Sequence, residues 1–142
     1  MTYDYTKTNK ENLTKLRDYL AALPDDYQNL EMSCFAIAEH IAANATPETG
    51  CNTPACAVAH GPAAGIRMSK RYCYNTGMYD FARYARDNFI NLAGDAGDLF
   101  RFAFSGNWPD SLAEVICRLT MIIEERVPGC WRYYSRFVEI EE

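Results

Sequence analysis

The chain has 142 residues with a formal net charge of −5, and 49% of its residues are hydrophobic. This length fits one domain, and the composition excludes a disordered tail. The acidic balance argues against a general binder of nucleic-acid backbones, because such proteins carry a basic stripe. An acidic surface that mimics nucleic acid stays open, although 19 scattered Asp and Glu residues are more often a solvated face.

The N-terminus is polar, and no apolar run approaches the roughly 20 residues that span a bilayer. We therefore expect no secretory signal and no membrane contact, and we expect the protein to be cytoplasmic. In that compartment the scattered cysteines are expected to be mostly reduced thiols. They are Cys34, Cys51, Cys56, Cys73, Cys117 and Cys130.

The N-terminal half of the chain predicts three helices. The first is marked by leucines at three- and four-residue spacing, namely Leu13, Leu16, Leu20 and Leu23. Pro24 ends it, and residues 1–8 before it are expected to be a flexible N-terminus. The Ala-rich stretch from Phe35 to Ala43 predicts the second helix. The third begins at Thr53, is cut short by Gly61-Pro62, and is expected to be central and buried because its side chains are small.

The C-terminal half predicts three more helices. One starts at Thr76 or Asp80 and runs towards Leu92, and a short aromatic one covers residues 98–104. The last begins at Ser111–Glu114, which match a capping box in which hydroxyl and carboxylate satisfy reciprocal backbone donors.

This last helix is expected to stop at Pro128-Gly129. Residues 131–142 are aromatic and roughly alternating at their end, which favours a strand or an extended arm. The arm could fold back or pair with a second copy, so we expect a homodimer. The prediction is a mainly α, single compact domain over residues 1–142, with five or six helices and possibly a short C-terminal strand or arm.

Residues 51–62 contain the highest concentration of candidate functional residues in the chain. Thr53 is a good N-cap, and the proline after it suits the first helical position. Cys56 and His60 then stand four residues apart on one helix face, and Cys51 lies on the loop just before them.

Three interpretations of this motif are open. Cys51, Cys56 and His60 could supply three zinc ligands. The fourth would be Cys34, His40 or Cys73. Cys56 and His60 could also form a nucleophilic pair. We favour a structural corner formed by Cys51, Thr53, Cys56 and His60, with His60 bonded to a backbone carbonyl or to the preceding loop, and with no metal, cofactor or catalytic residue.

Several tyrosines are harder to absorb into a core of this size. They are either half-exposed with their hydroxyls in water or, with the arginines beside them, part of a binding surface, where both residue types are enriched. The candidate binding surface consists of Tyr72, Tyr74, Tyr79, Arg83, Arg86, Tyr133 and Tyr134. Interleaved tyrosine and arginine could also stack nucleotide bases and hold phosphates. The sequence has no phosphate loop, paired catalytic carboxylates, serine elbow or zinc-protease motif, which weakens the case for an enzyme.

Several short motifs together resemble a family of small proteins found mainly in tailed bacteriophages and prophages. The residues that carry the resemblance follow the N-terminal Leu-rich helix and include the motif at Cys51-Asn52-Thr53-Pro54-Ala55-Cys56-Ala57-Val58-Ala59-His60. The others are Leu30-Glu31-Met32-Ser33, Phe104-Ser105-Gly106-Asn107-Trp108-Pro109 and the Ser111–Arg126 helix. The match covers roughly residues 13–129. Asn52 and Ala59 stand where this family has glycine, and asparagine partly imitates glycine because it tolerates positive φ.

The resemblance implies an accessory viral protein in the cytoplasm of a bacterial host. We expect a non-enzymatic binding protein that acts on a host macromolecule, a protein or protein complex, as a counter-defence or host-takeover inhibitor. The alternative is a protein that sequesters a nucleotide signal, and a metal-dependent enzyme is the third possibility.

Overall fold

The computed structural model describes residues 3–32, 42–50, 56–75, 78–91, 96–105, 108–129 and 131. Four α-helices lie in these ranges: α1 (Lys10–Ala21), α3 (Phe81–Asn88), α4 (Ala96–Phe104) and α5 (Leu112–Ile123). Three short 3-10 helices accompany them: η1 (Tyr5–Lys7), η2 (Val58–His60) and η3 (Lys70–Tyr72). The same ranges contain isolated bridges but no strand.

The mainly α fold is therefore confirmed, with four α-helices in the described residues rather than five or six. Most of the second expected helix falls at positions 33–41, outside the described residues, although Ala42 and Ala43 are helical. The expected C-terminal strand or arm and its dimer contact also fall outside them, apart from Trp131.

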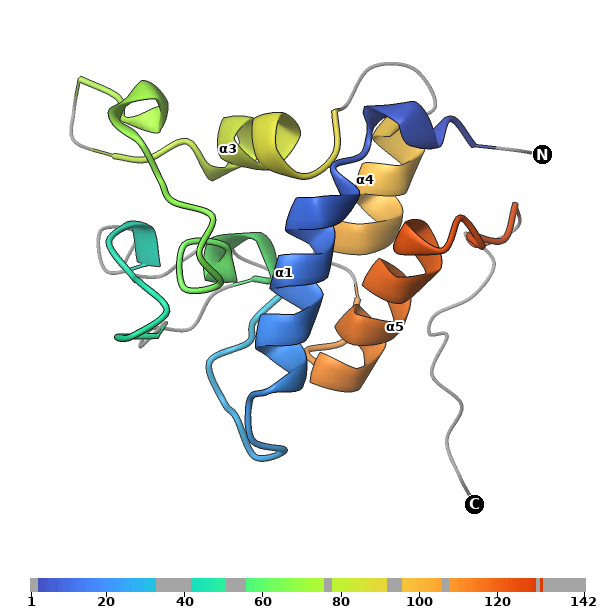
Figure 1. Ribbon diagram of the computed structural model, residues 1–142, viewed down its shortest axis with the longest axis horizontal. Coiled ribbons are helices and arrows are strands. Elements are labelled where there is room, and N and C mark those ends of the chain that lie inside the picture. The colour runs from blue at the N-terminus through green and yellow to red at the C-terminus, as the bar shows by residue number, and fades with distance from the viewer. Residues whose placement is uncertain are drawn as a thin grey trace.

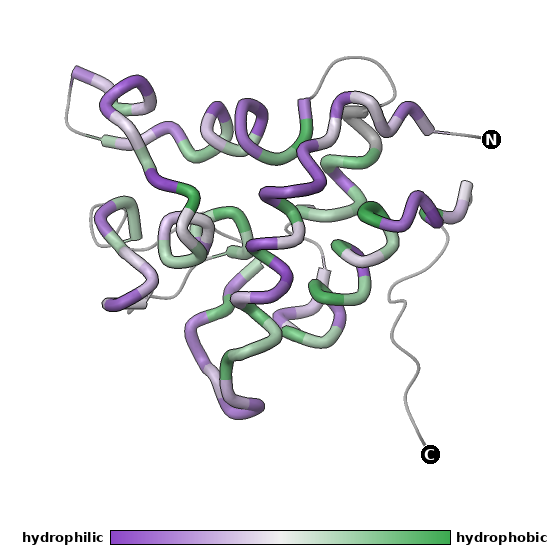
Figure 2. The backbone as a smooth tube through the Cα atoms, in the orientation of Figure 1, coloured by the Kyte–Doolittle hydropathy of each residue, from purple (hydrophilic) through white to green (hydrophobic). Residues whose placement is uncertain are grey.

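Helices α1 and α5 pack side by side, and α4 packs against α5 (Figure 1). Their inward residues are fully buried and recur at helical spacing: Leu13, Leu16, Leu20, Leu99, Phe102, Val115, Leu119 and Ile122. Hydrophobic and hydrophilic residues follow one another along α1 (Figure 2), as its amphipathic period requires. No helix in the described part of the chain has the length and apolarity that a bilayer span needs.

Side-chain caps set the starts of three helices. Asn9 accepts a hydrogen bond from the Asn12 N–H at 3.0 Å at the start of α1. Asp80 accepts from Arg83 N–H at 3.0 Å and Ser111 from Glu114 N–H at 3.2 Å, so the predicted starts at Asp80 and Ser111 are confirmed. Helix α4 begins at Ala96, two residues before the predicted position.

The carboxylate of Glu114, expected to complete the capping box, has a buried partner that the sequence pattern did not indicate. Glu114 and Arg118 stand one turn apart on α5, are both fully buried, and pair at 2.6 Å. Arg118 also donates to the Phe102 carbonyl at 3.3 Å, and its guanidinium carbon lies 3.3 Å from the centre of the Trp108 ring. The pair thus joins α5 to α4 and to the loop between them.

Residues 3–8, expected to be part of a flexible N-terminus, make contacts with the segment that follows α5. Tyr3 is buried and its hydroxyl donates to the Gly129 carbonyl at 3.4 Å, while the Tyr5 hydroxyl accepts from the Val127 N–H at 3.2 Å. Asp4 caps η1. These contacts fasten the beginning of the chain to the segment after α5, which the N-terminal residues could not reveal by themselves.

Helix α5 ends at Ile123, not at Pro128-Gly129 as predicted. Glu125 adopts a left-handed conformation with φ of 56°, which turns the chain away from the helix axis. The Arg126 N–H then donates to the Met121 carbonyl at 2.7 Å, and the Glu125 N–H to the Ile122 carbonyl at 3.0 Å. Carbonyls of the last turn are satisfied in this way, although glycine usually occupies the left-handed position.

We expect Glu125→Gly to raise the free energy of unfolding by up to about 1 kcal/mol, because glycine adopts positive φ without a Cβ clash. Glu125→Ala is the matched control, since both variants lose the exposed ion pair with Lys10 but alanine keeps the Cβ. Urea denaturation of the two variants measures the difference. Equal stability of the glycine and alanine variants would contradict this account of the turn.

Candidate functional site

His60 lies in the small-residue segment at 56–63, which is buried as predicted. Its Nδ1 lies 2.7 Å from the Cys56 carbonyl oxygen, and its Nε2 lies 2.7 Å from the Tyr27 hydroxyl. Because a carbonyl oxygen only accepts, Nδ1 carries the proton, and Nε2 accepts from Tyr27. Burial lowers the pKa of His60, which keeps the ring neutral despite the opposing effect of the Cys56 carbonyl.

The predicted hydrogen bond from His60 to a backbone carbonyl is therefore present. Residues 56–65 form a 3-10 turn and further turns rather than the regular helix that was expected. Thr53 and Cys51, the predicted cap and the loop cysteine, lie outside the described residues.

This geometry disfavours the two chemical interpretations of the motif. Both ring nitrogens of His60 are engaged, so neither offers a lone pair to a metal ion. Within the described residues no three His, Cys, Asp or Glu side chains are grouped as a metal site. Cys56 is buried, and a thiol away from solvent is a poor nucleophile.

Gly61 ends η2 where no larger residue fits. A Cβ built on Gly61 would lie 2.9 Å from Cε2 of Tyr84 and 3.0 Å from the Val58 carbonyl oxygen. Tyr84 cannot move aside, because its ring is fully buried and its hydroxyl donates to the Ile66 carbonyl. Helix α3 and η2 therefore pack against each other through the close contact between Tyr84 and Gly61.

The turn between η3 and α3 carries the exposed part of the predicted Tyr and Arg surface. Cys73 pairs with Tyr79 in an antiparallel bridge, and the Tyr74 N–H donates to the Met78 carbonyl at 2.7 Å. This hairpin lies at the outer edge of the molecule, beyond the start of α3 (Figure 1). The side chains of Tyr74 and Met78 are 54% and 57% exposed.

The cap of α3 connects this hairpin to the arginines of the helix. Asp80 accepts hydrogen bonds from the Arg83 N–H and the Tyr74 hydroxyl, and Arg83 and Arg86 lie near it. These contacts lower the pKa of Asp80 and keep it a carboxylate. We call Tyr74, Met78 and Arg83 the hairpin surface.

The other predicted surface residues differ in their exposure. Arg86 is exposed on α3 and Tyr79 is half-buried. Tyr72 is buried, so its place on a binding surface is corrected: its hydroxyl donates to Asp87 at 3.1 Å, and burial raises its pKa. Tyr133 and Tyr134 lie outside the described residues. Met78 is the member that sequence reasoning missed, because an isolated methionine is more often a core residue.

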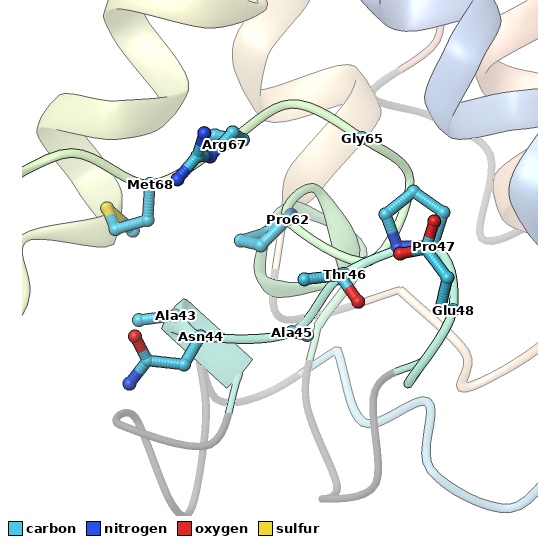
Figure 3. Close-up of a pocket in the computed structure, with 10 residues that line it drawn as sticks. All are labelled: Ala43, Asn44, Ala45, Thr46, Pro47, Glu48, Pro62, Gly65, Arg67 and Met68. Carbon is cyan, nitrogen blue, oxygen red and sulfur yellow. The ribbon is translucent and has the colours of Figure 1, made fainter.

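A cavity of about 380 Å³ separates the loop at 43–48 from the segment at 62–68 (Figure 3). Its lining carries one charge of each sign, Glu48 and Arg67. Thr46, the one hydroxyl among the lining residues, hydrogen-bonds with Thr49. The described lining therefore has no nucleophile paired with a base.

No protein-family model, curated protein or solved structure matches this chain. The resemblance to bacteriophage proteins, and the function and location expected from it, stay predictions.

We expect Gly61→Ala to lower the free energy of unfolding by about 1–3 kcal/mol, because the added methyl group overpacks the contact with Tyr84. Tyr84→Phe removes the hydroxyl that lies against Gly61. The double variant should therefore be more stable than the sum of the two single effects predicts. Strict additivity in urea denaturation would show that the two residues do not meet.

We expect the free energy of unfolding to fall as the pH drops below about 6.5, the ordinary histidine pKa. The unfolded chain then binds a proton at His60 that the folded chain does not bind. This lowers the free energy of unfolding by up to about 1.4 kcal/mol per pH unit. His60→Asn should flatten this dependence between pH 7.5 and 5.5. Asp4 and Asp80, whose folded pKa values are lowered, lose their stabilising effect only below about pH 4. An unchanged slope in His60→Asn would contradict the assignment.

Proposed function

We propose that the protein is a non-enzymatic binding protein of phage origin, and that it engages an acidic protein of the bacterial host through the hairpin surface. In this role it acts as a counter-defence or host-takeover inhibitor. The observation that carries the proposal is the exposure of Tyr74 and Met78 on one projecting turn.

Tyr74 and Met78 are the large hydrophobic side chains that stay exposed among the described residues. Aromatic residues and methionine are enriched in the buried centres of protein interfaces. A partner that covers both would remove their apolar surface from water, which is the main favourable contribution to association. Backbone pairing between residues 73 and 79 holds the two side chains on one turn before any partner binds.

Charge supports an acidic partner. Residues 67–86 contain five of the chain's 14 Lys and Arg residues but one of its 19 Asp and Glu residues. All five cations are exposed: Arg67, Lys70, Arg71, Arg83 and Arg86. A positive surface on an otherwise acidic chain steers an acidic partner to this face, because opposite charges attract.

The buried corner supports binding rather than catalysis. His60 is neutral, buried and bonded through both ring nitrogens, so it is not poised to exchange protons with a substrate. Cys56 is buried beside it. Both residues therefore support the fold of the segment that leads to the hairpin.

Affinity capture from host lysate tests the proposal with three versions of the protein. The wild type should capture an acidic protein that Tyr74→Ser/Met78→Ser binds at least about tenfold more weakly, since central interface residues dominate affinity. Glu11→Ser/Lys15→Ser is the matched control, because it also replaces two exposed residues, on α1, and should bind like the wild type. Equal melting temperatures establish that all three are folded. Capture of the same protein by all three versions, or of nucleic acid instead, would contradict the proposal.

A further inference from the structure

We propose a second binding site, separate from the hairpin surface: an anion site for the phosphate group of a small phosphorylated molecule. It lies in a polar pocket between the N-terminal segment and the end of α3. The pocket has a volume of about 430 Å³ and is lined by residues 6–9 and by Arg71, Arg86, Asp87, Phe89 and Asn91.

Backbone hydrogen bonds join the two segments that line this pocket. The Asn9 N–H donates to the Phe89 carbonyl at 2.7 Å, and the Asn91 N–H to the Lys7 carbonyl at 3.0 Å. Thr8 and Ile90 form an antiparallel bridge between them. Figure 1 shows the beginning of α1 beside the chain that leaves α3. The two segments are therefore held together before a ligand binds, which reduces the entropic cost of binding.

Three cations and one carboxylate line the pocket. Within the described residues, neither Lys7 nor Arg86 has a carboxylate within 4.0 Å. Arg71 Nη2 lies 2.9 Å from Asp87 Oδ2, which the Tyr72 hydroxyl also contacts at 3.1 Å. Asp87 thus orients the Arg71 side chain in the pocket lining. The described lining residues still carry more positive than negative charge, although the chain as a whole is acidic.

This arrangement suits a phosphate group. Guanidinium groups bind phosphate oxygens through paired, charge-assisted hydrogen bonds, and lysine adds a mobile positive charge. The N-cap residue of α1, Asn9, also lines the pocket, so the positive end of that helix lies at the site.

The same walls offer little to a nucleobase. Phe89 is the one aromatic residue among the described lining residues, and it is 1% exposed, so none of these residues offers an open ring face for stacking. The phosphate therefore supplies the affinity, and the organic part of the ligand extends towards solvent. A nucleotide would bind here through its phosphate and not through its base.

Calorimetric titration at constant ionic strength tests the site with ribose 5-phosphate, inorganic phosphate and AMP as probes. All three should bind with similar affinity, and ribose and adenosine should not bind. Lys7→Gln and Arg86→Gln should each weaken ribose 5-phosphate binding about tenfold, because each removes one charge-assisted contact. Arg101→Gln, the matched control, replaces an exposed arginine on α4 outside the pocket and should leave the affinity unchanged.

Asp87→Asn provides a test in the opposite direction. It removes the carboxylate that repels an anion and that occupies Arg71, so it should tighten ribose 5-phosphate binding several-fold. A residue that serves the fold alone would not produce a gain. The proposal is overturned by absence of binding, by equal losses in Arg101→Gln and Arg86→Gln, or by adenosine binding as tightly as AMP. Tighter binding of a single-stranded oligonucleotide than of AMP would identify a nucleic-acid groove instead. None of these outcomes depends on the hairpin surface.

Discussion

The fold depends on a buried ion pair between Glu114 and Arg118, which lies among the packed helices and whose neighbours compensate for its burial. Removing an ion from water costs several kcal/mol, so a buried pair persists only where geometry and hydrogen bonds compensate. Here the two side chains are one turn apart on α5, and the Phe102 carbonyl receives a hydrogen bond from Arg118. The face of the Trp108 ring covers the guanidinium, where its electron density attracts a cation.

These contacts fix the relative placement of the packed elements, which leucine packing by itself would not specify. Phe102 and Trp108 both pack against Trp131, so the rings around Arg118 also hold the segment beyond α5. Apolar faces such as those of α1 and α5 tolerate sliding and repacking. The buried Arg118, held by the Glu114 carboxylate and the Phe102 carbonyl, fixes how α4 and α5 are placed against each other.

The two proposed surfaces lie on a different part of the molecule, built from short elements. Helix α3 and the 3-10 turns η2 and η3 are held by side-chain contacts such as Tyr84 against Gly61. This part joins the helix core through the Phe89–Phe104 ring contact and through the backbone pairing of Asn9 with Phe89. Five exposed cations gather on this part at positions 67–86, while its inward side chains, such as Phe81 and Tyr84, are buried.

Local features were predictable from the sequence by itself. The leucine period of α1, the caps at Asp80 and Ser111, and the bond from His60 to the carbonyl four residues before it all depend on neighbours within one or two turns. A chain satisfies such interactions wherever it folds, so their residues are sufficient to indicate them. The early end of α5 escaped prediction because Glu125 does not normally adopt positive φ.

Only the tertiary structure decided what meets across long stretches of chain. Tyr27 reaches His60 over 33 residues, and the polar pocket joins residues 6–9 to residues 86–91. Burial of Arg118 and of Tyr72 contradicts their usual exposure and depends on partners that no spacing rule identifies. Periodicity indicates which face of a helix turns inward, but only the tertiary packing determines which neighbour that face contacts. The polar pocket depends on such long-range packing.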